Sequence, residues 1–242
     1  MALLRVDFFS DVLDLDTAMT VVLPPTGGPP PVLYLLHGLT DGHSAWSRFT
    51  SIERYATDRG LAVVMPQVHR SFYADETYGQ RFWTFLSEEL PATVERFFRV
   101  ATGRANTYVA GLSMGGYGAF KWALRQPERF AAAAALSGAL DVAYLQELDR
   151  RPEMRALTAR VFAGRTVRGS DEDLLHLVAT VDPATLPRLL LRCGADDHLR
   201  AQNERFLAAC AKHGVAVDAA FTPGEHTWPY WDREIQTVLD RL

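Results

Sequence analysis

The chain has 242 residues, a mass of 27.0 kDa and a formal net charge of −4, with 48% hydrophobic and 22% charged residues. This length and balance favour one globular α/β domain with a large core. The small negative charge gives no reason to expect nucleic acid or an anionic membrane surface as a partner, and two cysteines, Cys193 and Cys210, are too few for a disulfide framework or a zinc cluster.

The first half of the chain alternates apolar segments with amphipathic ones. The spacing of apolar residues predicts helices over 46–59 and 81–98, and Pro91 either kinks the second helix or starts its second half. Residues 67–80 are polar and aromatic without a clear period and predict a loop. The first two predicted strands form an antiparallel hairpin at a sheet edge, and the next two are continuous apolar runs typical of buried strands. These predicted strands are 4–10, 19–23, 32–36 and 61–65.

The second half repeats this alternation around one irregular stretch. Helices are predicted over 116–124, 200–213 and 230–242. The intervening residues 137–186 are dense in charge, with short helix signals, and lie where an α/β fold accommodates an insertion. Strands that alternate with helices favour a mostly parallel sheet covered on both faces. We therefore expect one domain over 1–242, with 137–186 as a helical insertion or cap. The strands predicted here are 107–110, 130–136, 188–193 and 215–221.

A G-x-S-x-G turn is the strongest motif in the chain. Gly111-Leu112-Ser113-Met114-Gly115 stands between a predicted strand and a predicted helix, the context of a nucleophile elbow. A serine at the tip of so tight a turn has a strained backbone, and the flanking glycines leave room because they lack a Cβ. The N-terminus of the following helix favours negative charge nearby. This context favours Ser113 as a nucleophile over a glycine-rich packing turn.

A serine nucleophile needs a base, and the base needs an acid that orients it. In hydrolases with this elbow, the acid and the histidine follow the serine in that order, after successive strands. Only His226, of seven histidines, lies in a loop directly after the last predicted strand. Asp196 and Asp197 both follow the preceding strand, and spacing alone does not separate them. We take Asp197 as the acid and Asp196 as the alternative; either could instead cap the next helix.

An oxyanion hole requires two backbone N–H groups that point at the developing charge. One is expected from Met114, the residue after the nucleophile, and the other from the loop after the first central strand. Leu39, which follows His37-Gly38, is the natural second donor. We interpret His37 as a structural residue that shapes this loop.

Five aromatic residues near the elbow and its loops are candidates for the substrate pocket. Tryptophan and tyrosine in a chain of this size are as readily part of the core as of a pocket wall. The candidates are Trp46, Tyr73, Trp83, Tyr117 and Trp228.

Taken together, these motifs resemble the esterase D family of α/β-hydrolases, and within it the bacterial tributyrin esterases. The resemblance runs from the N-terminal strands to the last helix. It departs at Tyr117, where related S-formylglutathione hydrolases carry histidine, and at His198, where tributyrin esterases carry an aromatic residue. The residues that carry the resemblance are His37-Gly38 with Trp46, Gly111 to Ala119, Cys193-Gly194-x-x-Asp197-x-Leu199, and Gly224-x-His226-x-Trp228-x-Tyr230-Trp231.

The resemblance implies an α/β-hydrolase with carboxylesterase activity on short acyl esters. It also implies the triad Ser113, Asp197 and His226, with Asp197 preferred over Asp196. No metal or cofactor is expected, and the partner is a small-molecule ester. The sequence predicts a cytoplasmic protein without a membrane segment, and it leaves a homo-oligomer open.

Several alternatives remain open from the sequence. The scissile bond could be a thioester, as in S-formylglutathione, or an acetyl or feruloyl ester on a sugar. An acyltransferase would use the same triad. Outside catalysis, the fold could serve as a silent binding scaffold, although retention of all three triad residues argues against that.

Overall fold

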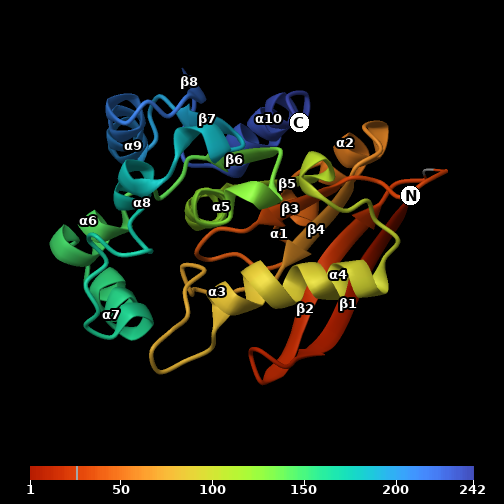
Figure 1. The fold of residues 1–242 in the computed structure, drawn as a ribbon, viewed down its shortest axis with the longest axis horizontal. Helices are drawn as coiled ribbons and strands as arrows, with labels where there is room; N and C mark the ends of the chain where they lie inside the picture. The colour runs from red at the N-terminus through yellow and green to blue at the C-terminus, as the bar shows by residue number, and fades with distance from the viewer. Residues whose placement is uncertain (26) are drawn as a thin grey trace.

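An eight-stranded sheet runs through the part of the chain that the computed structural model describes, residues 1–25 and 27–242 (Figure 1). The strand order is β1-β2-β4-β3-β5-β6-β7-β8. Strand β2 pairs antiparallel with β1 and with β4, and all other neighbours are parallel. The predicted edge hairpin and the mostly parallel sheet are therefore both present. The strands are β1 Ala2–Ser10, β2 Leu15–Leu23, β3 Val32–Leu36, β4 Ala62–Pro66, β5 Thr107–Leu112, β6 Ala132–Leu136, β7 Arg188–Gly194 and β8 Val217–Thr222.

The central strands are covered on both faces. Every residue of β3, β4 and β6 is buried, which explains why their sequences are continuous apolar runs rather than alternating ones. Strand β6 consists largely of alanine because helix α5 lies close to it. A Cβ added to Gly116 of that helix would already lie 3.3 Å from the Cβ of Ala135. Larger side chains on β6 would push the helix and its preceding turn away from the sheet.

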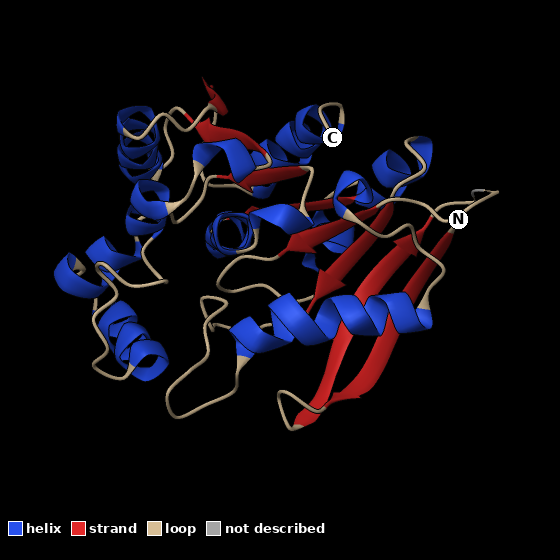
Figure 2. Ribbon diagram, in the orientation of Figure 1, coloured by secondary structure: helices blue, strands red, loops and turns tan. Residues whose placement is uncertain are grey.

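Two helical layers cover the sheet, as Figure 2 shows. Buried residues of α1, α2 and α10 form one apolar cluster with one face of the sheet, and α4, α5 and α9 pack on the other face. The bounds are α1 Ala45–Phe49, α2 Ile52–Asp58, α4 Leu90–Phe97, α5 Met114–Arg125, α9 Arg200–Lys212 and α10 Trp228–Leu239.

The predicted helix over 46–59 is wrong as one element, because the chain breaks it into α1 and α2. Thr50 is extended at this point, with φ −135° and ψ 172°. The N–H of Ser51 donates to the carboxylate of Asp232 at 3.0 Å, and the hydroxyl of Tyr55 donates to the same carboxylate at 3.1 Å. A partner far along the chain therefore fixes the break.

The second predicted helix, 81–98, also divides into parts. Helix α3, Phe82–Thr84, runs into a π-helical turn, Phe85–Glu89, before α4 begins at Leu90. Pro91 has no N–H to donate to the carbonyl four residues earlier, so the regular α-helical ladder cannot pass through this point. Of the two alternatives predicted for Pro91, a kink or the start of a second half, the structure shows the second.

Residues 137–186 are largely helical. Helix α8, Leu174–Thr180, packs against α5 and α9. Figure 1 shows α6, Val142–Leu148, and α7, Pro152–Phe162, together at the left of the view, outside the two main layers. A short 3₁₀ turn, Pro183–Thr185, leads into β7. None of the described helices is long and apolar enough to span a membrane.

Candidate functional site

The elbow between β5 and α5 holds Ser113 in a strained conformation. Its φ is 54° and its ψ is −117°, a region that non-glycine residues adopt only where surrounding structure enforces it. A Cβ on Gly111 would lie 2.3 Å from the carbonyl oxygen of Gly115, and a Cβ on Gly115 would lie 2.3 Å from that of Leu36. The two glycines are therefore required by steric contact within the turn and with β3.

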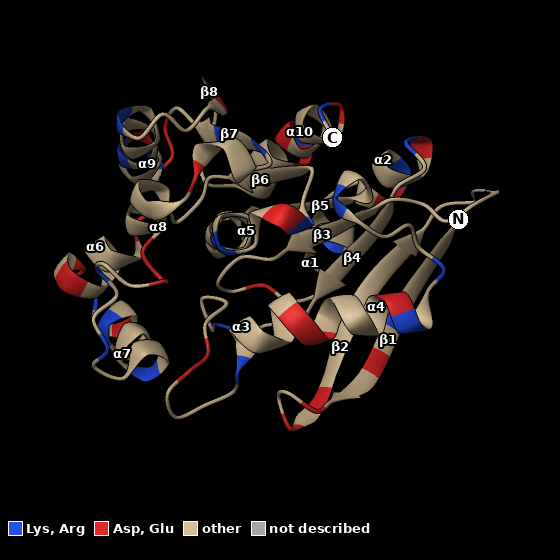
Figure 3. Ribbon diagram, viewed as in Figure 1, with Lys and Arg blue, Asp and Glu red and all other residues tan. Residues whose placement is uncertain are grey.

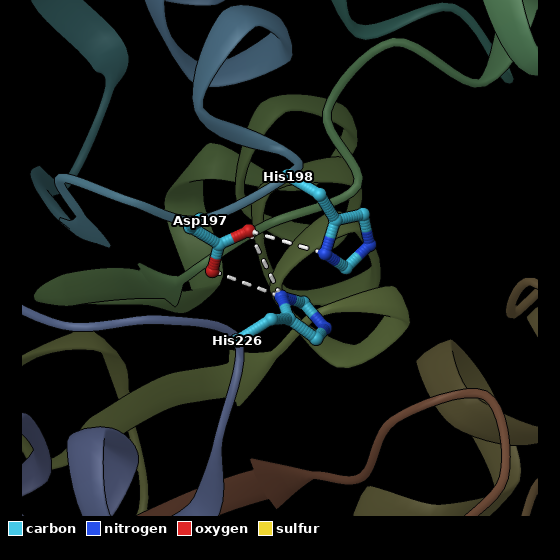
Figure 4. A group of neighbouring side chains, drawn as sticks. All are labelled: Asp197, His198 and His226. Carbon is cyan, nitrogen blue, oxygen red and sulfur yellow. Dashed lines mark hydrogen bonds and ion pairs between the residues drawn. The ribbon is translucent and has the colours of Figure 1, made fainter.

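Three side chains from three loops meet at the carboxyl ends of the strands. The Nε2 atom of His226 lies 3.1 Å from Oγ of Ser113, and its Nδ1 atom lies 2.9 Å from Oδ2 and 3.1 Å from Oδ1 of Asp197. Ser113 follows β5, Asp197 follows β7 and His226 follows β8. Figure 4 shows the pairing of Asp197 with His226. The arrangement can move a proton from the serine hydroxyl to the imidazole.

The acid next to His226 is Asp197, and Asp196 is exposed to solvent. The Asp197 side chain is fully buried. Burial alone would raise its pKa, but hydrogen bonds from His226, from the Leu199 N–H at 2.7 Å and from Ser137 outweigh burial and hold the pKa below its usual value. Asp197 is therefore ionised and able to stabilise a charged imidazolium.

Ser137, at the end of β6, is a member of the site that the sequence analysis missed. Its hydroxyl accepts the indole N–H of Trp231 at 3.1 Å and helps to lower the pKa of Asp197. The Trp231 ring lies edge-to-face with His226, with centroids 4.9 Å apart. Ser137 has a positive φ of 49°, which again indicates an enforced position. A polar residue at the carboxyl end of the strand beside the nucleophile strand is the signal that could have identified it.

The loop after β3 approaches Ser113 closely. A Cβ on Gly38 would lie 3.7 Å from the Cβ of Ser113. The N–H of Gly38 donates to Oδ2 of Asp41 at 3.1 Å, which leaves the next N–H, that of Leu39, as the predicted oxyanion donor of this loop. No hydrogen bond of the described residues occupies it. Met114 opens α5, where the first N–H groups have no partner within the helix.

The phenol of Tyr73 fastens this loop to the nucleophile helix. Its hydroxyl donates to the carbonyl of His37 at 2.8 Å, and its own carbonyl accepts the Nζ of Lys121 on α5 at 2.7 Å. Lys121 is fully buried and paired with Glu172. Tyr73 has a positive φ of 51°, so these two contacts hold an unfavourable backbone. Tyr73 therefore positions the residues that carry the Leu39 N–H.

We expect Tyr73→Phe to lower kcat by roughly 10-fold with little change in KM, because a loosened donor loses part of the 100- to 1,000-fold effect of complete removal. Steady-state kinetics on an aryl ester measures this, and thermal unfolding checks the fold. Tyr34→Phe is the matched control, since Tyr34 is a buried tyrosine of β3 with its side chain in the core. An equal loss of kcat in both variants would contradict the positioning role.

His37 is buried, with 1% of its surface exposed. Its Nε2 accepts the N–H of Val68 at 3.1 Å, so Nδ1 carries the proton that it donates to the carbonyl of Gly38 at 2.8 Å. These contacts agree with the structural interpretation from the sequence. Burial lowers the pKa of His37 to about 4, so the ring is neutral at physiological pH.

The lowered pKa of His37 predicts acid sensitivity. Below the ordinary value of 6.5, the unfolded chain binds a proton at this ring, but the folded chain does not until about pH 4. Since one pKa unit corresponds to about 1.4 kcal/mol, the free energy of unfolding falls by about 3 kcal/mol from this residue as pH drops through that window. Urea unfolding at pH 7 and pH 4.5 should show a smaller drop for His37→Gln than for the unchanged chain. Parallel losses would contradict this assignment.

Most of the aromatic residues predicted as pocket walls lie elsewhere. Trp46, Tyr73 and Tyr117 are fully buried, so the prediction is wrong for them: their side chains present no surface to a substrate. Trp46 donates to the carbonyl of Leu36, and Tyr117 donates to Glu172. Trp83 lines a separate cavity of about 440 Å³ between α5 and residues 165–172. The burial of these side chains depends on tertiary contacts with distant parts of the chain, which the local sequence does not show.

Trp228 is half-buried, two residues after His226. Its ring stacks on Phe49 at 4.9 Å and lies edge-to-face with Trp231 at 5.3 Å. Of the five predicted wall residues, Trp228 alone keeps a substantial part of its surface open, and it contacts Trp231, the ring that packs against His226.

A groove of about 620 Å³ opens between the Leu39 loop and α7. The helix contributes one face, with residues spaced three and four apart. Leu39 belongs to both the groove and the loop after β3, so the groove adjoins the loop that carries the predicted oxyanion donor. Acidic and basic residues both lie along α7 (Figure 3). The lining residues are Leu39, Thr40, Asp41, His69, Arg70, Glu153, Ala156, Leu157 and Arg160.

Among the described residues, Asp197, His198 and His226 form a group whose donor atoms are close enough to bind one metal ion. The two cysteines are buried, and burial raises the pKa of each thiol to about 12. The raised pKa keeps both thiols protonated at neutral pH, so neither acts as a thiolate nucleophile.

Comparisons with known proteins agree with this geometry. Residues 10–242 match the family described as "Putative esterase". An acetyl esterase of Caldicellulosiruptor saccharolyticus is 27% identical over 99% of this chain and 97% of its own length.

Two solved structures from Staphylococcus aureus have the same fold. FphF, a fluorophosphonate-binding serine hydrolase, has a TM-score of 0.90 and 31% identity over 99% of this chain and 97% of its own. FrmB, an S-formylglutathione hydrolase, has a TM-score of 0.86 and 30% identity over 99% and 98%. The chain therefore belongs to the esterase family and is an α/β-hydrolase that acts as a serine carboxylic ester hydrolase.

Proposed function

We propose that this esterase hydrolyses short-chain acyl esters through an acyl-enzyme on Ser113. The observation that carries the proposal is a continuous chain of hydrogen bonds. Oγ of Ser113 lies 3.1 Å from Nε2 of His226, and Nδ1 of His226 lies 2.9 Å from Oδ2 of Asp197. Two backbone N–H groups, of Leu39 and Met114, make no hydrogen bond among the described residues and are the expected oxyanion donors. Such a hydrogen-bond chain makes the serine hydroxyl nucleophilic, and such N–H donors stabilise the oxyanion that forms when the serine attacks the ester carbonyl.

The reaction proceeds in two acyl transfers. His226 accepts the hydroxyl proton as Ser113 attacks the ester carbonyl, and Asp197 stabilises the imidazolium that forms. The N–H groups of Leu39 and Met114 hold the tetrahedral oxyanion. His226 then protonates the leaving alcohol, and in the second half it activates water to release the acid.

The groove along α7 supports a small ester as substrate. Its lining includes the apolar side chains of Leu39, Ala156 and Leu157 and the charged side chain of Arg70. Trp228, two residues after His226, stays the candidate wall residue from the sequence. The helical segment 137–186, which supplies α7, is proposed as a cap within one domain of residues 1–242. The cytoplasmic location and the oligomeric state remain predictions from the sequence.

The names of the relatives point to different substrates. The name of the acetyl esterase supports an acetyl ester as the substrate of this chain, and the name of FrmB supports a thioester as the alternative. The test is the initial rate on p-nitrophenyl esters from acetate to long acyl chains, with S-formylglutathione alongside. We expect a maximum at the shortest chains. A strong preference for S-formylglutathione would move the substrate to the thioester, and a maximum at long chains would contradict the proposal.

A further inference from the structure

His198 lies beside the catalytic pair without a part in the acyl-transfer reaction. Its Nδ1 is 3.8 Å from Oδ1 of Asp197, and its ring centroid is 4.5 Å from that of His226 (Figure 4). Its side chain is 62% exposed, whereas that of Asp197 is fully buried. One donor atom from each of the three residues lies within 4.8 Å of the others.

We propose that Asp197, His198 and His226 form a binding site for a late first-row divalent cation such as Zn²⁺, and that its occupation switches the esterase off. Two imidazoles and one carboxylate are the ligand set that Zn²⁺ accepts, with a fourth position left for water. Mg²⁺ and Ca²⁺ prefer all-oxygen ligands and do not fit this set.

The separations suit such an ion. Bonds of about 2.0–2.2 Å place tetrahedral donors roughly 3.4 Å apart. Oδ1 of Asp197 lies 3.1 Å from Nδ1 of His226 and 3.8 Å from Nδ1 of His198, on either side of that value. His198 is the exposed member, so a small rotation of its side chain completes the site while the buried Asp197 stays in place.

Inhibition follows from the tautomer of His226. For catalysis, Nδ1 carries the proton that is bonded to Asp197, and Nε2 offers its lone pair to Ser113. A cation that binds Nδ1 displaces the Nδ1 proton to solvent and takes the electron pair of that nitrogen. The neutral ring keeps one proton, which moves through solvent to Nε2. Nε2 then carries a hydrogen toward Oγ of Ser113 and cannot accept another, so kcat falls while substrate binding is unaffected.

The experiment measures esterase activity in ZnCl₂ and in MgCl₂ for the unchanged chain, His198→Phe and a control, His213→Asn. His213 lies at the C-terminal end of α9, and it is half-buried. Each rate is compared with the same protein's rate without metal. We expect Zn²⁺ to lower kcat of the unchanged chain and of the control, with recovery in EDTA. We expect the inhibition constant to rise at least 10-fold in His198→Phe, because one of three protein ligands is gone. Equal inhibition of all three proteins would overturn the proposal, as would equal inhibition by Mg²⁺.

A second measurement does not depend on activity. Calorimetric titration of Ser113→Ala with ZnCl₂ should give one bound ion per chain, and the same titration of Ser113→Ala with His198→Phe should show that binding weakened by the same factor. Absence of Zn²⁺ binding to Ser113→Ala would overturn the site even if the esterase mechanism is correct. Zn²⁺ binding without inhibition of the active protein would overturn the proposed switch.

Discussion

Ser113→Ala is expected to lower kcat by about 10,000-fold or more, because the hydroxyl that forms the acyl-enzyme is absent. Oγ makes one side-chain hydrogen bond in the described structure, to Nε2 of His226. Its removal therefore leaves the surrounding contacts in place, and alanine keeps the backbone as restrained as serine does. Initial rates on p-nitrophenyl acetate measure the loss, and circular dichroism with thermal unfolding shows that the fold is retained.

The triad also predicts how the effects of two substitutions combine. Substitutions of residues that act together in one step have non-additive effects on kcat. His226→Ala should lower kcat by a similar factor, and the double variant of Ser113 and His226 should lose little more than either single variant. Fully additive losses would contradict a shared proton-transfer step.

Asp197→Asn is expected to lower kcat by about 10,000-fold near neutral pH. An amide NH₂ cannot accept the Nδ1 proton, so His226 is driven to the tautomer whose Nε2 carries a hydrogen toward Ser113. The variant also loses the charge that stabilises the imidazolium. The geometry should survive, because the amide oxygen can still accept the N–H of Leu199 that Asp197 accepts at 2.7 Å.

Asp196→Asn is the matched control for this variant. It makes the same chemical change one residue away, at an exposed side chain, and should leave kcat within about twofold, as surface substitutions usually do. If instead Asp196→Asn were the inactive variant and Asp197→Asn the active one, the structural assignment of the acid would be contradicted.

The pair Asp196 and Asp197 also shows the limit of spacing as an argument. The sequence places both residues at the end of a strand, and neighbouring residues have the same spacing to every motif. The choice is made by a tight turn, in which the Asp197 N–H donates to the carbonyl of Gly194 at 3.2 Å and the Asp197 carboxylate accepts from Leu199. This turn buries one carboxylate and exposes the other, and that asymmetry cannot be read from local sequence.

The elbow was predictable for the opposite reason. Its requirements are local: glycines on both sides of Ser113, a strand before and a helix after. The structure adds the cause, since a Cβ on Gly115 would meet the carbonyl of Leu36 on the neighbouring strand. Regular strands were also predictable, because burial on both faces leaves a continuous apolar run.

The aromatic residues were not predictable in this way. Tyr73 and Tyr117 are residue types that often line substrate pockets, but the packing of residues 67–80 against α5 buries both side chains. A Cβ on Gly118 would lie 2.5 Å from the Tyr73 ring, so the contact depends on a glycine 45 positions away in the chain. Likewise, the break between α1 and α2 depends on Asp232. Such long-range contacts leave no periodic trace in the sequence.

The most direct test of the account is to locate the acyl group. The enzyme is mixed with p-nitrophenyl acetate, quenched in acid within the first turnovers, and mapped by peptide mass spectrometry. The account predicts one added acetyl group, on Ser113, which is absent when Asp197→Asn or His226→Ala is treated for the same time. An acetyl group on another residue of the active enzyme, or turnover without any acylated Ser113, would contradict it.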